Sequence, residues 1–402
     1  MSYGHVFKDV TGQYLFIRQL GTGVSCRAQL VRHLTTGEYR VRKVLHRRVG
    51  TGQVLPRSTR YTPDADIQAI IQFNNEVAIV DLLQRNVNHN SLKVSTLLSQ
   101  STQVDERKGK YSRVSYWSLS NGGDLESFIE NYGYPIPRPF ILQFLSQTLT
   151  TLHQLYTACH DRLGPIIHND CHAGNILLHY PNAQTVIPEF HLIDFGLATP
   201  LSPAFIADDN DFLLPTPGNP PDWDIPRLLT SLDKLLATWP PEYEAFLRSQ
   251  GDPIGTAYRL LLDLDRRFQN LLEQHRQYID QTRDYSQRLT LPDLRPVIEY
   301  VNNCPLTRDF YGEEMKGHQL YSQAYRTLCD PNFTIPQTYN TLDEIGHTKD
   351  LPGPWHIGYL DPGRNHQLLD LLAVGNKDTF HRPNEDNENS DTDSAWGEDE
   401  DD

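Results

Sequence analysis

The chain has 402 residues with 36 basic and 51 acidic side chains, which gives a formal net charge of −15. Ten acidic residues and no basic residue lie within 383–402, so the rest of the chain carries only 36 − 41 = −5. That balance argues against the broad basic surface that binding to nucleic acid or anionic membrane requires. The length allows two or three domains, or one two-lobed enzyme with extensions.

No run approaches the roughly 18 consecutive apolar residues of a membrane-spanning helix, and the first ten residues lack a secretory-signal pattern. The five cysteines are scattered and show no CxxC spacing, which argues against a disulfide framework or a structural zinc site. We therefore predict an intracellular protein of the cytoplasm or nucleus, with neither a membrane nor a nucleic acid as partner.

The first hundred residues are predicted to form strands and one helix. Residues 14–20 mix aromatic and β-branched side chains. Two apolar runs within 27–45 flank a Thr-Gly-Glu turn and predict a hairpin. Residues 46–66 are polar and rich in Gly, Pro and Arg, and we interpret them as a long loop or an insertion. Between Ile67 and Leu83 the apolar residues keep helical spacing.

Helical patterns dominate beyond residue 120. Apolar residues from Ile141 to Leu155 form one continuous stripe, which predicts a buried helix of about five turns. The other predicted elements are short strands at 175–180 and 190–195 and helices at 227–236 and within 255–303. Residues 304–382 have mixed polarity and are interpreted as a C-terminal extension. The acidic residues 383–402 cannot bury enough apolar surface to offset the entropy of ordering, so we predict a disordered tail.

The first motif that carries chemistry is Gly21-Thr22-Gly23, between two predicted strands. Glycines in such a turn let the backbone approach a polyphosphate and offer N–H donors to it. Alone, the pattern also fits an ordinary hairpin. A dinucleotide-binding fold would need a helix directly after the glycines, whereas a strand follows here.

The second motif is Lys43, at the end of a predicted strand. A single strand lysine is commonly only an edge charge. The functional alternative is an ammonium group that binds phosphate and is held by a carboxylate on the next helix. Glu76 is the candidate carboxylate, 33 residues further on, and the loop at 46–66 accounts for that long separation.

The third motif is the loop within residues 166–178, IIHNDCHAGNILL. Asp170 and Asn175 lie five positions apart in it, between a predicted helix and a predicted strand. A polar turn would explain either residue alone. The pair is typical of a loop that mounts a carboxylate for an acceptor hydroxyl and an amide that holds a cation.

The fourth motif is Asp194, in Ile-Asp-Phe-Gly after an apolar strand. Such an aspartate can be a mere strand terminator. Together with Asn175 it supplies two oxygen ligands for Mg²⁺, which prefers carboxylate, water and phosphate oxygens.

In this order, the four motifs resemble those of the eukaryotic protein kinase superfamily, in a divergent, fungal-type form, over residues 11–303. Residues 121–125, Asn-Gly-Gly-Asp-Leu, are similar to the segment after the kinase hinge. The resemblance implies an α+β, two-lobed protein kinase-like fold. Its small, mainly antiparallel N-lobe would be 11–119, with the insertion near 46–66, and its larger helical C-lobe would be 120–303.

The resemblance also implies that ATP and Mg²⁺ are the cofactors. Gly21 and Gly23 would lie over the ATP phosphates, and Lys43 would bind the α- and β-phosphates. Ser118 and Ser120 of the hinge and Asp124 just after it would also contact ATP. Trp117 would be the gatekeeper beside the hinge.

For the transfer step, Lys43, its partner Glu76 and Asp170 would be the catalytic residues, with Asp170 orienting the acceptor hydroxyl. Asn175 and Asp194 would bind Mg²⁺. In the same resemblance, His168 would brace the catalytic loop and Phe195 would pack between the lobes. Phosphate transfer is catalysed mainly by positioning the reactants and neutralising the charge on the phosphates, so these groups act as a unit.

Several positions depart from the family pattern. Cys26 replaces the third glycine, and Asn169 replaces the arginine that commonly pairs with a phosphorylated activation loop. His172 replaces the catalytic-loop lysine, as in aminoglycoside and choline phosphotransferases. No clear Ala-Pro-Glu follows the Asp-Phe-Gly element. Asp222 or Asp224 is expected to be the carboxylate that anchors the loop from the next helix.

Three functional hypotheses follow. The first is an ATP- and Mg²⁺-dependent protein serine/threonine kinase with a protein substrate. The second keeps the reaction but takes a small-molecule hydroxyl as acceptor, as His172 and the missing Ala-Pro-Glu suggest. The third is a nucleotide-binding pseudokinase scaffold, suggested by Cys26 and Asn169, although the lysine, glutamate, aspartate and asparagine positions are all present.

Overall fold

The computed structural model describes most of the chain up to residue 305 and a few residues beyond it: 6–22, 26–48, 63–86, 92–105, 110–132, 135–157, 164–201, 223–249, 251–282, 290–305, His318, Arg326 and 329–332. Gly23, residues 49–62 of the predicted loop and the predicted acidic tail 383–402 lie outside the described residues.

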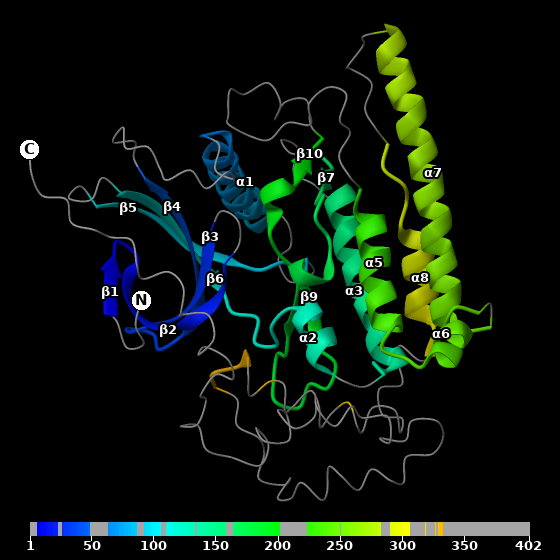
Figure 1. The fold of residues 1–402 in the computed structure, drawn as a ribbon, viewed down its shortest axis with the longest axis horizontal. Helices are drawn as coiled ribbons and strands as arrows, with labels where there is room; N and C mark the ends of the chain where they lie inside the picture. Colours follow the sequence, from blue (N-terminus) through cyan, green and yellow to red (C-terminus); the bar gives the residue numbers. More distant parts are fainter. Residues whose placement is uncertain are drawn as a thin grey trace, which may run out of the picture.

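The N-terminal part is one antiparallel sheet of six strands in the order β1-β2-β3-β4-β6-β5 (Figure 1). The strands are β1 (Val6–Asp9), β2 (Gly12–Thr22), β3 (Cys26–His33), β4 (Tyr39–Arg48), β5 (Leu97–Asp105) and β6 (Lys110–Ser118). The predicted hairpin is confirmed, because β3 and β4 are joined by a turn in which Gly37 has a φ of 75°. Such a φ favours glycine over any residue with a β-carbon.

One face of the sheet carries its own small core, formed by Tyr14, Val31, Val44, Val114 and Tyr116, all fully buried. The rings of Tyr14 and Tyr116 stack with their centroids 4.3 Å apart. Alternation along each strand turns every second side chain to this face, which is why these residues from four strands meet.

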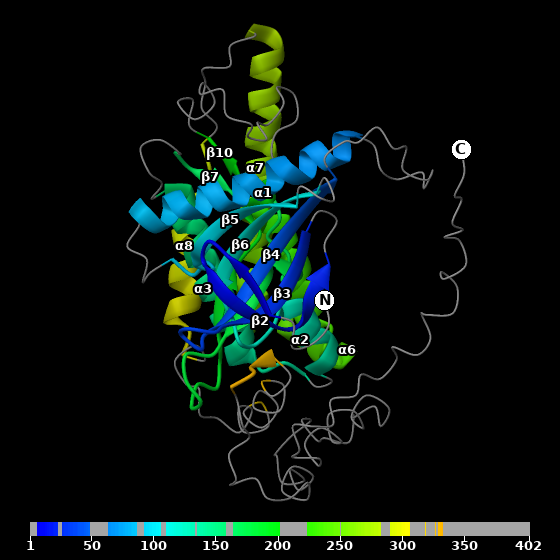
Figure 2. The same cartoon turned by 90° about the vertical axis from the view of Figure 1, so that its left-hand side faces the viewer.

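Helix α1 (Pro63–Asn86) lies across the strands, as Figure 2 shows. Phe73, Val77, Val80 and Leu83 keep the predicted helical spacing and are buried. The predicted loop at 46–66 was too long at both ends, since 46–48 continue strand β4 and α1 already begins at Pro63. The polar residues at these two ends carry no periodic apolar signal, so composition alone could not set the limits.

The C-terminal part is mainly helical. Its helices are α2 (Leu125–Tyr132), α3 (Arg138–Thr157), α5 (Asp224–Leu236), α6 (Pro241–Leu247), α7 (Pro253–Thr282) and α8 (Arg295–Asn303). In α3, every residue of the predicted stripe from Ile141 to Leu155 is fully buried, which confirms that helix and its inward face. None of the helices in the described residues combines the length and the apolar character needed to cross a bilayer.

Short elements between α3 and α5 join the two parts. They are β7 (Ile166–Ile167), η2 (Ala173–Asn175), β8 (Ile176–His179), β9 (Glu189–Leu192), η3 (Phe195–Leu197) and β10 (Thr199–Pro200). β8 pairs with β9, and β7 pairs with β10, both antiparallel. Helix α1 packs against η3, so the sheet part and the helical part meet there. The α+β architecture with an antiparallel sheet and a helical region is confirmed, and the kinase-like assignment stays a prediction.

The predicted C-terminal extension contributes side chains to the helical part. His318 is buried between α2 and α3, where its Nδ1 lies 2.6 Å from the hydroxyl of Tyr132. Arg326 is also buried and lies over the ring of Tyr180. Asp330 accepts a hydrogen bond from the amide of Asn121, directly after the expected hinge.

Burial of His318 predicts a pH-dependent stability. Burial lowers the pKa of His318 from 6.5 to about 3, so the folded state keeps the imidazole neutral. The unfolded chain binds a proton at this residue below about pH 6.5, and the free energy of unfolding therefore falls as the pH drops toward 3. We expect the loss between pH 7 and pH 5 to be about 2 kcal/mol smaller in His318→Gln than in the unsubstituted protein, measured by urea unfolding.

His275→Gln on α7 is the control with the same replacement at a partly exposed position. An equal pH dependence in His318→Gln and in the unsubstituted protein would show that the imidazole titrates alike in both states, and would contradict the burial of this residue.

Candidate active site

Lys43 and Glu76 form the ion pair that the sequence predicts. Lys43 lies on β4 between β3 and β6, and Glu76 lies on the face of α1 that covers the sheet. The Nζ–Oε1 distance is 2.5 Å, and the side chains are 15% and 5% exposed. Burial alone would lower the pKa of Lys43, but the charges of Glu76 and Asp194 raise it above its ordinary value. The ammonium group is therefore charged, and it lies 5.3 Å from the ring centre of Trp117.

His168 braces the loop between β7 and β8. It is fully buried, its Nε2 lies 2.8 Å from the carbonyl oxygen of Ile193, and its Nδ1 accepts from the backbone N–H of Asp170. These partners place the proton on Nε2, and burial lowers the pKa of His168 so that the ring stays neutral. The ring also packs edge-on against Phe195 at 4.7 Å. The predicted structural role of His168 is confirmed.

Asp224, the first residue of α5, holds the loop backbone from beneath. It is fully buried, and its carboxylate accepts from the backbone N–H groups of His168 (3.1 Å) and Asn169 (2.8 Å) and from the hydroxyl of Tyr156 (2.9 Å). The sequence left Asp222 and Asp224 as alternatives for the anchoring carboxylate. Asp224 has the contacts of that role, whereas Asp222 lies outside the described residues.

Asp170 and Asn175, which the sequence places five positions apart in this loop, are in direct contact. The Asn175 amide nitrogen donates to the backbone oxygen of Asp170 at 3.0 Å and to its Oδ2 at 2.9 Å. Two further side chains approach the Asp170 carboxylate, Arg227 with Nη1 at 3.0 Å from Oδ1 and His172 with Nε2 at 3.7 Å from Oδ2. Burial tends to raise the pKa of Asp170, but His172 and Arg227 lower it overall. The carboxylate is thus ionised at neutral pH.

Sequence reasoning missed Arg227. It lies on α5 three residues after Asp224, so one helical turn supplies both the anchor of the loop and a cation for Asp170. The Asp-x-x-Arg spacing is visible in the sequence. It points to Asp170 only once α5 is known to begin beneath the loop.

Asp194 lies beside Asn175 because of the pairing of β8 with β9. The N–H of Ile193 donates to the backbone oxygen of Asn175 at 3.0 Å. Asp194 is the next residue along the chain, so its backbone lies near Asn175. Asp194 has φ 62° and ψ 67°, an exposed side chain, and a carboxylate whose Oδ1 accepts from the N–H of Gly196 at 3.3 Å.

The donor set at this point suits a hard divalent cation. The amide nitrogen of Asn175 is used in bonds to Asp170, which leaves its Oδ1 as the atom for a cation. The backbone contact between Asn175 and Ile193 brings the next residue, Asp194, close to this position. Among the described residues there is no group of three or more His, Cys, Asp or Glu side chains arranged to hold a metal. A nucleotide-bound Mg²⁺ takes one or two protein oxygens and draws its other ligands from phosphates and water, and these two residues fit that pattern.

The predicted ATP-contacting residues are only partly placed. Gly21 is an exposed residue of β2 opposite Ala28, and a β-carbon added to it would meet no atom within 4 Å. Packing therefore does not explain the glycine. Gly23 lies outside the described residues, and Cys26 begins β3 with a partly exposed side chain.

The segment predicted to be the hinge lies at the end of β6 and just after it. Ser118 ends that strand and pairs with Thr96, and Ser120 is buried. The Asp124 carboxylate caps α2, accepting from the backbone N–H of Ser127 at 2.7 Å and from its hydroxyl at 2.8 Å. The structure thus gives Asp124 a local structural role, and a contact between Asp124 and a nucleotide stays a prediction.

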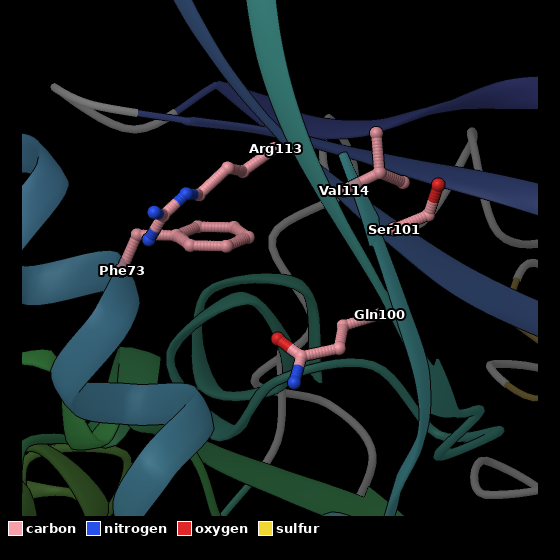
Figure 3. A pocket seen from close by; sticks show the side chains of 5 residues that line it. All are labelled: Phe73, Gln100, Ser101, Arg113 and Val114. Atoms are coloured by element: carbon pink, nitrogen blue, oxygen red, sulfur yellow. The ribbon is translucent and has the colours of Figure 1, made fainter. Parts of the chain in front are cut away.

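A cavity of about 340 Å³ lies between α1 and strands β5 and β6 (Figure 3). The phenyl ring of Phe73 and the guanidinium group of Arg113 lie at its α1 side, and the amide of Gln100 extends toward the same space. Its other lining residues are Ser101 and Val114. None of these lining residues is a predicted site residue.

The structure therefore joins Lys43 to Glu76 and Asp170 to Asn175 by direct hydrogen bonds, with Asp194 adjacent to both pairs. In comparisons with known proteins, no family model matches this chain and no curated protein sequence matches it.

Proposed function

We propose that this protein is an ATP- and Mg²⁺-dependent phosphotransferase with a protein kinase-like fold, and that it transfers the γ-phosphate to a serine or threonine hydroxyl of a protein. The observation that carries the proposal is the convergence around Lys43. Its ammonium group bonds Glu76 from α1 and is acted on by the charge of Asp194 from the helical part. A buried lysine that is paired with one carboxylate and stabilised by the charge of a second is a suitable phosphate-binding cation, because it stays charged and fixed in place.

The residues divide the chemistry as follows. Lys43 would bind the α- and β-phosphates of ATP, and Asn175 with Asp194 would hold Mg²⁺, which neutralises developing charge on the phosphates. The acceptor oxygen forms a new bond to the γ-phosphorus while the bond from that phosphorus to the β-phosphate oxygen breaks, and ADP leaves. Asp170, ionised and fixed by Asn175 and Arg227, orients the acceptor hydroxyl and takes its proton.

The acceptor class is the part of the proposal on which the alternatives differ. The hairpin of the N-terminal sheet and the Asn-Gly-Gly-Asp-Leu segment support the protein kinase reading. His172, 3.7 Å from Asp170, is the residue that favours a small-molecule phosphotransferase. A pseudokinase scaffold would bind nucleotide without transferring phosphate.

One experiment separates the three. The full-length protein is incubated with Mg²⁺ and ATP labelled in the γ-phosphate, together with either a serine- and threonine-containing peptide library or a panel of small alcohols. Label transferred to peptides and not to alcohols is the expected result. Transfer to alcohols alone would replace the protein acceptor by a small molecule. ATP binding with no more transfer than the Asp170→Asn, Asp194→Asn double variant would overturn the enzyme proposal.

A further inference from the structure

Two asparagine amides bind the same short segment, residues 195–199. Asn75 reaches it from α1, and Asn169 reaches it from the loop after β7. Both use the amide nitrogen as a donor, and both belong to positions for which no catalytic role follows from the four motifs.

Asn75 is only 1% exposed. Its Nδ2 lies 3.0 Å from the carbonyl oxygen of Gly196 and 2.9 Å from that of Ala198, with the oxygen of Phe195 at 3.5 Å. The next residue along α1 is Glu76, which binds Lys43. One helical turn therefore fixes both the lysine and the backbone that follows Asp194.

Asn169 donates to the carbonyl of Leu197, which lies between the two carbonyls that Asn75 binds most closely, those of Gly196 and Ala198. Its Nδ2 lies 2.7 Å from the oxygen of Leu197 and 2.7 Å from the hydroxyl of Thr199. Its own backbone is held by Asp224. Thr199 is 5% exposed and pairs with Ile167 in the β7–β10 ladder, so the segment is also fixed at its far end.

The segment needs such support because of the backbone at its start. Among the described residues, Asn169 and Asp194 are the non-glycine residues with positive φ, at 65° and 62°. A left-handed conformation is unfavourable for a residue with a β-carbon and persists only where the surroundings over-determine it. Hydrogen bonds to three successive carbonyls, at residues 196–198, provide that constraint directly after Asp194.

We propose that Asn75 and Asn169 are positioning residues that keep the Asp194 carboxylate turned toward Lys43 and Asn175, and that they do so without any phosphorylated side chain. This inference rests on the proposed function. It also predicts that activity does not require phosphorylation of Thr199, Ser202 or Thr216. The hydroxyl of Thr199 is buried and is itself a partner of Asn169, whereas Ser202 and Thr216 lie outside the described residues.

The test replaces each amide nitrogen by an oxygen of the same shape. In Asn75→Asp and Asn169→Asp, a carboxylate oxygen replaces the nitrogen that donates to the backbone carbonyl oxygens. Because an oxygen without a hydrogen cannot donate, these hydrogen bonds are lost. Asn74→Asp is the matched control, because it is the same change on the neighbouring residue of α1, where the side-chain oxygen accepts from Arg113 and is kept. Asn75→Ala serves as a second variant in case a buried carboxylate prevents folding.

The first readout is hydrogen exchange at the amides of 194–201, which does not depend on activity. We expect exchange about tenfold faster in Asn75→Asp and Asn169→Asp and unchanged in Asn74→Asp. The second readout is kinetic: kcat should fall about tenfold while KM for ATP stays within twofold, since Lys43 and Glu76 remain in place. Effects of the double variant should be less than additive, because both amides hold one segment.

The outcomes separate this inference from the proposed function. Unchanged exchange in both donor variants, or kcat that falls equally in Asn74→Asp, would overturn the positioning role while leaving phosphate transfer intact. Faster exchange in a protein that transfers no phosphate under any condition would overturn the proposed function instead. Phosphatase treatment that lowers kcat of the unsubstituted protein would refute the independence from phosphorylation.

Discussion

Asp170→Asn and Asp194→Asn are each expected to lower the rate of phosphate transfer by at least about 100-fold, which corresponds to roughly 2.7 kcal/mol of transition-state stabilisation. Asp194→Asn removes a negative charge from the two-residue cation site. Asp170→Asn removes the group that takes the acceptor proton, and it leaves Arg227 facing a neutral amide. The two losses have different causes, so Asp194→Asn alone should also raise the Mg²⁺ concentration needed for half-maximal activity.

Steady-state turnover with saturating ATP is the measurement, with thermal unfolding to check that each variant folds. Asp81→Asn on α1 is the control, because it makes the same chemical change at a solvent-accessible ion pair with Arg85, five residues beyond Glu76. Turnover within threefold of the unsubstituted protein in both active-site variants would contradict the assignment of these carboxylates.

Asp224→Ala is expected to produce the largest loss of stability. Three buried donors, the N–H groups of His168 and Asn169 and the hydroxyl of Tyr156, would lose their acceptor together. Each unsatisfied buried donor costs about 1–3 kcal/mol, so the free energy of unfolding should fall by about 3 kcal/mol or more. Because typical domains are stable by about 5–15 kcal/mol, such a loss is severe.

Urea unfolding at pH 7 measures this effect. Asp233→Ala is the matched control on the same helix, since its carboxylate is 45% exposed and pairs with Arg248 at the surface, where ion pairs contribute little. A loss below 1 kcal/mol in Asp224→Ala would show that the loop backbone does not depend on this anchor. Asn169→Asp provides a further check, because its backbone N–H should still bond Asp224 after the side chain changes.

The site residues that could be predicted share one property, a meaningful place in a local sequence pattern. Lys43 ends an alternating strand, Glu76 lies on the buried face of a periodic helix, and Asp170 and Asn175 fall in one short loop. The contact between Lys43 and Glu76 was correctly predicted because each element type, once fixed, restricts where its side chains point. Gly23 and the glycine turn remain a prediction, since that turn is outside the described residues.

Arg227, Asn75 and Asn169 show what local patterns could not reveal. Arg227 is one of several polar residues on an amphipathic helix, and nothing near it in the chain marks it as the partner of Asp170. Asn75 lies beside Glu76 among buried apolar residues of α1, where the sequence gives no reason to prefer a core position over a hydrogen bond to a segment 120 residues away. Such pairings depend on the docking of whole elements against one another.

The sequence by itself determined the order and type of most elements, the buried stripe of α3, and the residues able to carry phosphate-transfer chemistry, because hydrophobic periodicity and side-chain chemistry are local properties. Only the tertiary structure decided which of these groups meet. The packing of α1 on η3, the β8–β9 pairing and the start of α5 beneath the loop set those distances, since each brings together residues whose separation along the chain carries no signal of contact.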